Sequence, residues 1–278
     1  MKPRTSELVK KVLPALALPL LRPVYHCAFR AWVRVWCGCV GLWDPLAARR
    51  SGIPALPPAA LRYRVGQSPY VSTFLTVGRM AAENLRAALV RAGRPLETFD
   101  SILDFGCGCG RTLVWLARGN SSHRFYGTDV DGAAIAWCRA NQKFAEFHRN
   151  APLPPLPYGD GKFDLVYAIS VFTHLDEDLQ SRWFAELRRV VRSGGLLILS
   201  VHGQAVWREL CDADRSQLEQ RGFLFQRSGK CRGIFPPWYQ TSFHAEGYIR
   251  EQLGGHFRIL EYLAEGMGYQ DLVVAAAE

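Results

Sequence analysis

Apolar and polar positions alternate in regular blocks along most of the chain from residue 96 onward. Short apolar runs that predict buried strands cover residues 98–105, 123–129, 162–170 and 196–201. Runs with apolar residues three or four positions apart predict helices over residues 111–118, 131–141 and 176–191. Strands that alternate with helices predict an α/β fold around a doubly wound, mostly parallel sheet.

Two later segments break this rhythm. Residues 257–265 and 270–277 are apolar runs separated by the turn residues Gly266, Met267 and Gly268, which together predict a terminal antiparallel hairpin. Residues 203–243 combine a polar helical stretch with short aromatic runs, so we expect them to form an insertion.

The N-terminal part has its own helical period. Within residues 22–43, one stripe of positions four apart holds Arg22, His26, Arg30 and Arg34. Aromatic residues such as Trp32 and Trp36 fill the remaining positions, so this helix either packs on the main domain or lies at a membrane interface. Residues 44–68 are rich in Pro and Gly, which predicts a linker or extended arm, and residues 69–93 predict a further helix.

Charge is distributed unevenly along the 278 residues. The formal net charge is +9, and residues 1–64 hold eleven Lys or Arg against two acids, whereas the remainder holds 23 of each sign. A basic segment of this kind suits an anionic surface such as a membrane or nucleic acid. The balanced body argues against nucleic acid as the main partner.

The eight cysteines include no C-x-x-C pair, so we expect neither a metal site nor a disulfide framework. Reduced thiols indicate a cytoplasmic protein. Peripheral contact with a membrane surface through residues 22–43 remains the alternative to packing of that helix on the domain. Lys10, Lys11 and the apolar run after them are similar to the start of a signal peptide. Pro14 and Pro19 interrupt that run, which is also too short to span a bilayer, so we expect no secretory leader.

The sequence D-F-G-C-G-C-G at residues 104–110 follows the first predicted strand. Ligands of open α/β sheets bind beyond the carboxyl ends of the strands, where glycines let the backbone approach closely. A dinucleotide fingerprint would require glycine at position 111, which is Arg111, so the spacing is G-x-G-x-G. Asp129 ends the second strand and can accept hydrogen bonds from both hydroxyls of a ribose, which predicts an adenosyl site.

Four segments then resemble, in order, the motifs of class I S-adenosylmethionine-dependent methyltransferases: I-L-D-F-G-C-G-C-G, F-Y-G-T-D, F-D-L-V-Y-A-I-S-V-F-T-H-L and L-R-R-V-V-R-S-G-G-L-L-I-L-S. The resemblance covers residues 95–278 and implies a Rossmann-like, seven-stranded sheet with a terminal antiparallel strand. It divides the chain into a basic, aromatic helical extension with a linker, residues 1–64, and a methyltransferase domain, residues 65–278. Within that domain, residues 65–95 would form a covering helix and residues 203–243 a substrate-side insertion.

The resemblance also implies S-adenosylmethionine as cofactor and a set of residues that bind it. These are Asp104, Phe105, Gly106, Cys107, Gly108, Gly110, Asp129, Val130, Asn150, Ser170, Val171 and Phe172. Asp104 would lie near the methionine amino group, Asp129 at the ribose diol and Val130 on the adenine. Asn150 stands where the family usually places an acid for the adenine amine. Further candidate contacts from the covering segment are Tyr63, Tyr70 and Arg79.

Methyl transfer needs a base only if the acceptor must lose a proton. Candidate catalytic residues are His174, His202, Tyr239 and His244, with His174 first because it follows the fourth strand by four residues. His174 has a structural alternative, a cap or packing role in its loop.

The place after the fourth strand lacks the D/N-P-P-Y/F motif of base-methylating enzymes, and Pro236-Pro237 lies elsewhere in the fold. The insertion residues Phe235, Trp238, Tyr239 and Phe243 form either an acceptor wall or a small satellite core.

We therefore expect an enzyme that methylates an O, N or C atom of a small-molecule, glycan or lipid-like acceptor. Two alternatives remain open: an RNA or protein methyltransferase that uses the basic arm, and a protein that binds S-adenosylmethionine without catalysis. An NAD-dependent oxidoreductase is disfavoured because G-x-G-x-x-G is absent.

Overall fold

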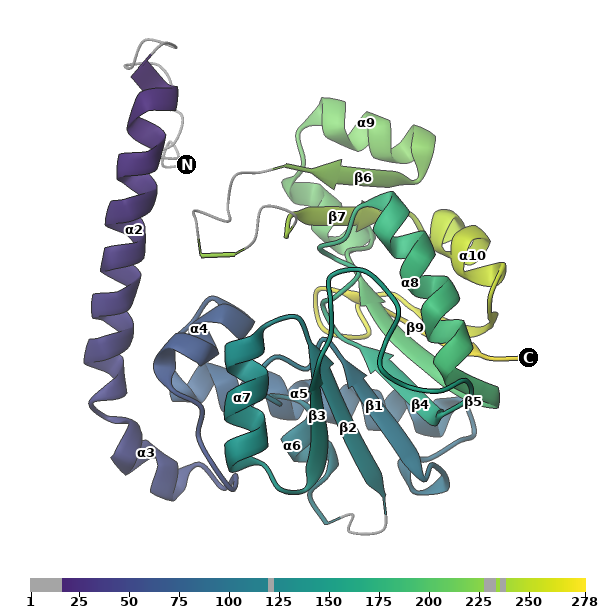
Figure 1. Cartoon of the computed structure of the whole chain (residues 1–278). Helices are drawn as coiled ribbons and strands as arrows, with labels where there is room; N and C mark the ends of the chain where they lie inside the picture. The colour runs from purple at the N-terminus through teal and green to yellow at the C-terminus, as the bar shows by residue number, and fades with distance from the viewer. Residues whose placement is uncertain (1–16, 120–122, 228–233, 236–238) are drawn as a thin grey trace.

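A computed structural model describes residues 17–119, 123–227, 234–235 and 239–278 (Figure 1). The strands are β1 (Ser101–Phe105), β2 (Arg124–Asp129), β3 (Ala145–Arg149), β4 (Phe163–Ala168), β5 (Val191–Val201), β6 (Phe223–Gln226), β7 (Thr241–His244), β8 (Arg258–Leu263) and β9 (Asp271–Ala276). The helices are α2 (Ala17–Gly41), α3 (Asp44–Arg50), α4 (Ala59–Gly66), α5 (Val71–Arg91), α6 (Leu113–Leu116), α7 (Gly132–Asn141), α8 (Glu177–Val190), α9 (Asp212–Arg221) and α10 (Glu246–Gly254). Two short 3₁₀ helices are η1 (Leu96–Thr98) and η2 (Gln204–Glu209).

Seven strands form one sheet in the order β3-β2-β1-β4-β5-β9-β8. β1 to β5 pair in parallel, whereas β9 runs antiparallel between β5 and β8. The order reverses between β1 and β4, because β1 is flanked by β2 on one side and β4 on the other. This topology confirms the predicted doubly wound fold with its antiparallel terminal strand.

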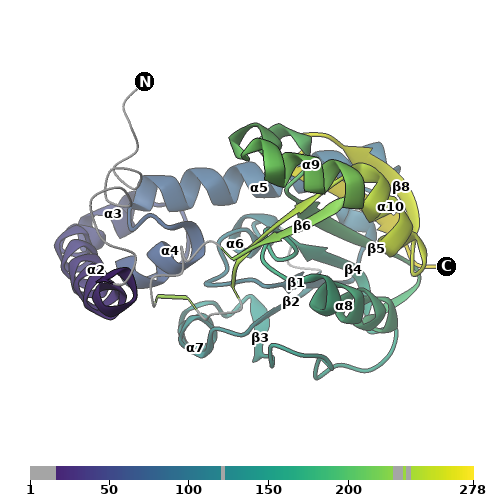
Figure 2. The same cartoon turned by 90° about the horizontal axis from the view of Figure 1, so that it is seen from above.

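Two hydrophobic cores lie on opposite faces of the sheet. Ile102 belongs to the core shared with α5, α6 and α7, whereas its neighbour Leu103 belongs to the core shared with α8 and α10. Successive side chains of a strand point to opposite faces, so a sheet covered on both sides has continuously apolar strands. Figure 2 shows the sheet between α5 and α8.

The sequence patterns located most elements within a few residues but missed β3 and α10. They also placed a helix break at Ser193-Gly194-Gly195, where the structure has the beginning of β5. Val191 already pairs with Phe163, and the register shifts before Leu196 pairs with Leu165. The two glycines therefore lie in an irregular part of the strand rather than in a loop.

The prediction that residues 44–68 form a linker is wrong, because α3 and α4 lie there. The Arg62 side chain is buried and holds the segment together: it pairs with Asp44 Oδ1 at 2.7 Å, and its Nε donates to the carbonyl of Pro69. α4 contacts both α2 and α5. The predicted domain boundary between residues 64 and 65 falls inside α4.

The segment 203–243 contains η2, α9 and the separate two-stranded sheet β6–β7 in its described part. A small core there consists of Leu210, Leu218, Leu224 and Phe243. Phe243 is thus a core residue rather than part of an acceptor wall, and Trp238 lies outside the described residues.

Candidate active site

A cavity of about 830 Å³ lies at the carboxyl ends of β1, β2 and β4. Ten of the predicted cofactor residues line it: Asp104, Phe105, Gly106, Cys107, Gly108, Asp129, Val130, Asn150, Ser170 and Val171. This is the edge of the sheet where the strand order reverses, the place expected for a ligand of this fold.

The loop after β1 needs its glycines for two separate reasons. Gly106 has φ +79° and Gly108 has φ +55°, both in the left-handed region that favours glycine. A Cβ at Gly106 would also lie 2.3 Å from Cγ2 of Val171, and a Cβ at Gly108 would lie 2.7 Å from Cγ2 of Val65. The bare backbone therefore forms the floor of the cavity.

Asp129 lies at the end of β2 and is held by the backbone. Its Oδ2 accepts a hydrogen bond from the Gly108 N–H at 2.7 Å, and its Oδ1 accepts one from the Asp131 N–H at 2.7 Å. Each oxygen of a carboxylate can accept two hydrogen bonds, so Asp129 can also accept hydrogen bonds from the hydroxyls of a ribose. Burial raises the pKa of the Asp129 carboxyl.

Asp104 and Arg111 bring a carboxyl group and a guanidinium group into the same cavity. Burial raises the pKa of the Asp104 carboxyl to about 8, and the charge of Asp129 adds to the shift. Burial lowers the pKa of the Arg111 guanidinium, and its Nε has no hydrogen-bond partner among the described residues. From the sequence, Arg111 served only to exclude a dinucleotide site, and its position in the cavity wall was not predicted.

Asn150 and Ser170 line the cavity but are already engaged within the protein. The Oδ1 atom of Asn150 accepts from the Thr128 hydroxyl at 2.8 Å, and its Nδ2 donates to the carbonyl of Ala151. Ser170, two residues after β4, has φ +58°, a strained conformation for a residue other than glycine. Ser170 N–H donates to the Ser200 hydroxyl, which helps hold that turn.

Gly110 and Phe172 do not line the cavity. A Cβ at Gly110 would lie 2.2 Å from Oε1 of Gln142, so this glycine permits the loop to pack on the residue that follows α7. Phe172 is fully buried and stacks on Phe184 of α8 with ring centroids 4.7 Å apart. Both are structural residues rather than ligand contacts.

His174 and Tyr239 come together at the cavity wall. Their rings stack with centroids 3.8 Å apart, and Phe235 stacks on the other side of Tyr239 at 4.8 Å. His174 Nδ1 lies 2.7 Å from the carbonyl oxygen of Gln240, and a carbonyl only accepts, so Nδ1 carries the proton and Nε2 the lone pair. Burial lowers the pKa of His174 to about 4, so the ring is neutral at neutral pH.

His202 and His244 lie behind this wall and do not line the cavity. The Nδ1 atom of His202 lies 3.0 Å from the carbonyl oxygen of Ser242, and its ring centroid is 6.5 Å from that of His174. His244 is fully buried, and its Nε2 lies within 3.1 Å of the side-chain amide of Gln180. Burial lowers the pKa of His244 to about 3. Because His244 is fully buried away from the cavity, its predicted catalytic role is wrong.

α5, which makes up most of the predicted covering segment 65–95, contributes none of the residues that line the cavity in the described part of the chain. α4 contributes Arg64 and Val65, and Val65 is the first residue of that segment. Tyr63 is buried against Trp36 of α2, and Tyr70 and Arg79 are solvent-exposed. None of these three residues lines the cavity, so their prediction as cofactor contacts is wrong. Arg64 Nε lies 3.0 Å from Oδ2 of Asp131, which connects α4 to the loop after β2.

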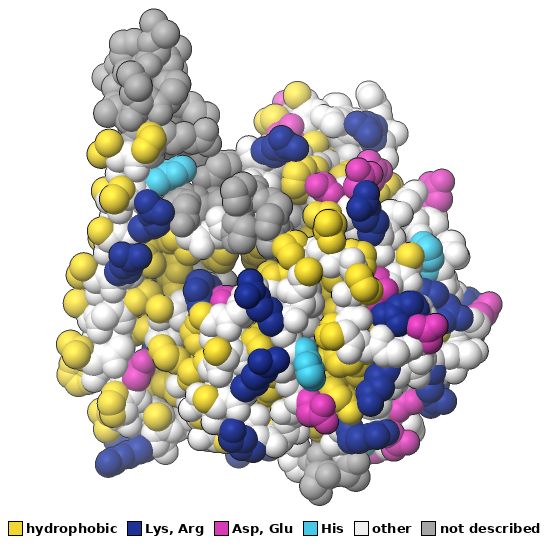
Figure 3. Space-filling view, in the orientation of Figure 1, with side chains coloured by type: hydrophobic (Ala, Val, Ile, Leu, Met, Phe, Trp, Pro, Cys, Tyr) yellow, Lys and Arg dark blue, Asp and Glu magenta, His cyan; other side chains and the backbone are white. Residues whose placement is uncertain are grey.

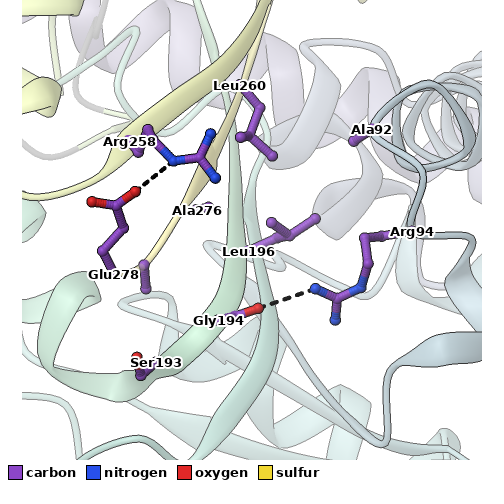
Figure 4. Close-up of a pocket in the computed structure, with 10 residues that line it drawn as sticks. Ala92, Arg94, Ser193, Gly194, Leu196, Arg258, Leu260, Ala276 and Glu278 are labelled. Atoms are coloured by element: carbon purple, nitrogen blue, oxygen red, sulfur yellow. Dashed lines mark hydrogen bonds and ion pairs between the residues drawn. The ribbon is translucent and has the colours of Figure 1, made fainter.

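A second cavity, of about 530 Å³, lies at the opposite end of the sheet (Figure 4). Arg94 Nη1 donates there to the carbonyl of Gly194 at 3.1 Å, and Arg258 pairs with Glu278. Its two arginines thus have partners within the protein. Within the described ranges, no three His, Cys, Asp or Glu side chains are grouped so that they could hold a metal ion.

The fold, the glycine loop and the acid after β2 together define a class I methyltransferase domain, the class whose methyl donor is S-adenosylmethionine. Comparison with known proteins agrees, since residues 103–199 match the family model described as a methyltransferase domain. Residues 103–199 therefore carry a methyltransferase domain, and the resemblance predicted from the sequence is confirmed for this part of the chain.

Two curated relatives illustrate the similarity. The probable methyltransferase ltbC of Aspergillus luteorubrus is 25% identical over 166 residues, 55% of this chain and 58% of that protein. Malonyl-[acyl-carrier protein] O-methyltransferase of Hahella chejuensis is 32% identical over 114 residues, 41% of this chain and 39% of that protein. The chain thus spans about half the length of these relatives, or less.

Among solved structures, the fold is similar to that of 1,6-didemethyltoxoflavin-N1-methyltransferase from Burkholderia thailandensis. The TM-score is 0.52 with 18% identity, over 81% of this chain and 92% of that chain. The magnesium protoporphyrin IX methyltransferase of Synechocystis has a TM-score of 0.50 with 20% identity, over 75% of this chain and 87% of that chain. Identities this low support the fold alone.

Proposed function

We propose that this chain transfers a methyl group from S-adenosylmethionine to a nucleophilic atom of a small-molecule or lipid-like acceptor. The observation that carries the proposal is Asp129, whose two carboxylate oxygens are fixed by the Gly108 and Asp131 N–H groups at the edge of the cavity. S-adenosylmethionine, when bound, supplies a methyl group activated by the positive sulfur to which it is attached.

The charged residues of the cavity fit the parts of this cofactor. Asp104 is buried and lines the cavity, and a carboxyl in that position suits the ammonium of the methionine part. Arg111 carries the opposite charge and an unpartnered Nε, which suits the carboxylate. Asp129 suits the ribose diol, and the glycine loop leaves room for close approach.

The aromatic wall of Phe235, Tyr239 and His174 supports the acceptor side of the proposal. Stacked rings favour a flat or apolar acceptor and exclude water from the reacting atoms. Neutral His174 keeps a lone pair on Nε2, because Nδ1–H donates to the Gln240 carbonyl. Nε2 would accept the proton of a hydroxyl or amine, whose acidity rises steeply as the new bond to carbon forms.

Thermal shift assays test the cofactor directly. S-adenosylmethionine and S-adenosylhomocysteine should raise the melting temperature, and NAD should not. Asp129→Ala should abolish the shift, whereas Asp160→Ala, a change in an exposed acid of the 150–160 loop remote from the cavity, should leave it intact. Tight cofactor binding without turnover on any acceptor would instead favour a non-catalytic binding protein. A shift with NAD, or an unchanged shift in Asp129→Ala, would contradict the proposed site.

A further inference from the structure

We propose that the outer face of α2 and α3 is a docking surface for a membrane with anionic headgroups. The surface consists of the exposed side chains between residues 23 and 50. The proposal is independent of the reaction proposed above, because none of these side chains lines the cavity.

The inner face of α2 is already occupied by the protein. Val33 and Cys37 are buried in a small cluster with Ala59 and Tyr63 of α4. Trp36 meets the ring of Tyr63 edge-on, with centroids 5.8 Å apart. The apolar residues on this face of α2 are therefore explained by packing on the domain.

The other half of the pattern faces solvent. The large exposed apolar side chains of α2 are Val24 (65% exposed), Trp32 (54%) and Val35 (65%), among others, and Leu42 (79%) and Trp43 (70%) follow between α2 and α3. At about 100° per residue, Val24, Trp32 and Val35 of α2 fall with Ala28 and Cys39 in an arc of roughly 80°, away from Val33 and Cys37. Figure 3 shows hydrophobic side chains along α2 with Lys or Arg beside them.

The charge beside the apolar arc has one sign, and Arg30 and Arg34 fall on the flank of α2 between the inner face and this arc. The exposed charged residues between 23 and 50 are Arg30, Arg34, Arg49 and Arg50, and the sole acid of that range, Asp44, is paired with buried Arg62. The sequence as a whole places its entire net charge of +9 in residues 1–64. An anionic partner is therefore favoured, and a second copy is disfavoured, because two such faces would repel each other.

Tryptophans and aliphatic side chains beside arginines are what an interfacial helix presents to lipid headgroups. Nucleic acid would satisfy the arginines but would leave the apolar arc without a partner. None of the helices that the structure describes is long and apolar enough to cross a bilayer. The helix would therefore lie in the plane of the membrane surface.

Docking in this way would bring the cavity close to the membrane. Ile234 packs against the inner cluster of α2 and also lines the cavity. The cavity wall then lies about one helix diameter, roughly 10 Å, from the lipid-facing side of α2.

Co-sedimentation of the full chain with vesicles tests the proposal. Vesicles of phosphatidylcholine with one third phosphatidylglycerol should bind the protein at low salt, and vesicles of phosphatidylcholine alone should not. Changing Arg30 and Arg34 together to Gln should lower the partition coefficient about 25-fold, at about five-fold for each charge. Arg221→Gln, a similarly exposed arginine of α9, is the matched control and should have no effect.

A second pair of variants tests the apolar arc. Val35→Ser should weaken binding to vesicles roughly five-fold, because the variant has less apolar surface to transfer from water into the lipid. Val90→Ser is its control, since Val90 of α5 is 63% exposed and Val35 is 65% exposed. Equal binding by these two variants would contradict the proposal, as would sedimentation that does not depend on lipid charge.

An environment-sensitive fluorophore on a native thiol locates the contact. Cys39 lies in the apolar arc and Cys211 precedes α9, and both are exposed. In variants that keep one of these thiols and replace the other accessible cysteines by Ser, vesicles should shift the emission of a label on Cys39 to the blue. The emission of a label on Cys211 should not change. The opposite result, or concentration-dependent dimers that survive without vesicles and bury Cys39, would overturn the proposal.

Discussion

The protonation of Asp104 should make cofactor binding depend on pH. In the free chain, burial raises the pKa of this carboxyl to about 8, so only about 1% of it is ionised at pH 6 and about 24% at pH 7.5. A ligand ammonium beside Asp104 favours the ionised form. The dissociation constant of S-adenosylhomocysteine should therefore fall about 25-fold between pH 6 and pH 7.5, which corresponds to about 1.9 kcal/mol.

Isothermal titration at both pH values measures this change. Two controls separate Asp104 from other groups: the Asp104→Asn variant, and 5′-methylthioadenosine, which lacks the ammonium and carboxylate of the larger ligand. His174 does not titrate in this range, because burial lowers its pKa to about 4. An affinity for S-adenosylhomocysteine that is the same at both pH values, or a slope that persists in Asp104→Asn, would refute the reasoning.

The same carboxyl should affect the stability of the free chain, with the opposite sign. Its pKa in the folded state is raised above the ordinary value, so its contribution is present at low pH and is lost as the pH rises through about 8. The melting temperature of the free chain should thus fall between pH 5 and pH 8. The melting temperature of Asp104→Asn should fall less over that range. Calorimetry in which the melting temperatures of both proteins fall equally with pH would contradict the raised pKa of Asp104.

Three further predictions concern single residues. Arg111→Gln should weaken S-adenosylhomocysteine about ten-fold or more in titrations, through the loss of a charged hydrogen bond, and should leave 5′-methylthioadenosine unchanged; equal losses for both would place Arg111 elsewhere. Gly110→Ala should lower the melting temperature by at least about 5 °C more than Gly119→Ala, because both have positive φ but only Gly110 has a neighbour, Gln142, in the way. His174→Asn should keep the affinity for S-adenosylhomocysteine and reduce turnover. At saturating S-adenosylmethionine, the turnover rate of the wild type should show no inflection near pH 6.5, since burial lowers the pKa of His174 to about 4; an inflection there that is absent from His174→Asn would contradict this.

Local signals in the sequence determined the sheet and the floor of the cavity. Strands covered on both faces are apolar throughout. A backbone position with positive φ is usually occupied by glycine. An acid at the end of a strand lies next to the ligand-binding loops at that edge of the sheet. For these reasons Gly106, Gly108 and Asp129 were predictable, and the structure places all three together. β3 was missed because A-E-F-H-R carries only one apolar residue that is buried.

Only the tertiary structure determined which residues distant in sequence contact each other. Arg62 became buried because Asp44, 18 residues earlier, pairs with it, so a segment that reads as a linker folds into helices. His244 became a core residue because Gln180 lies 64 residues away in sequence and within 3.1 Å in space. Which histidine faces a cavity depends on such pairings, and no periodicity of a single segment encodes them.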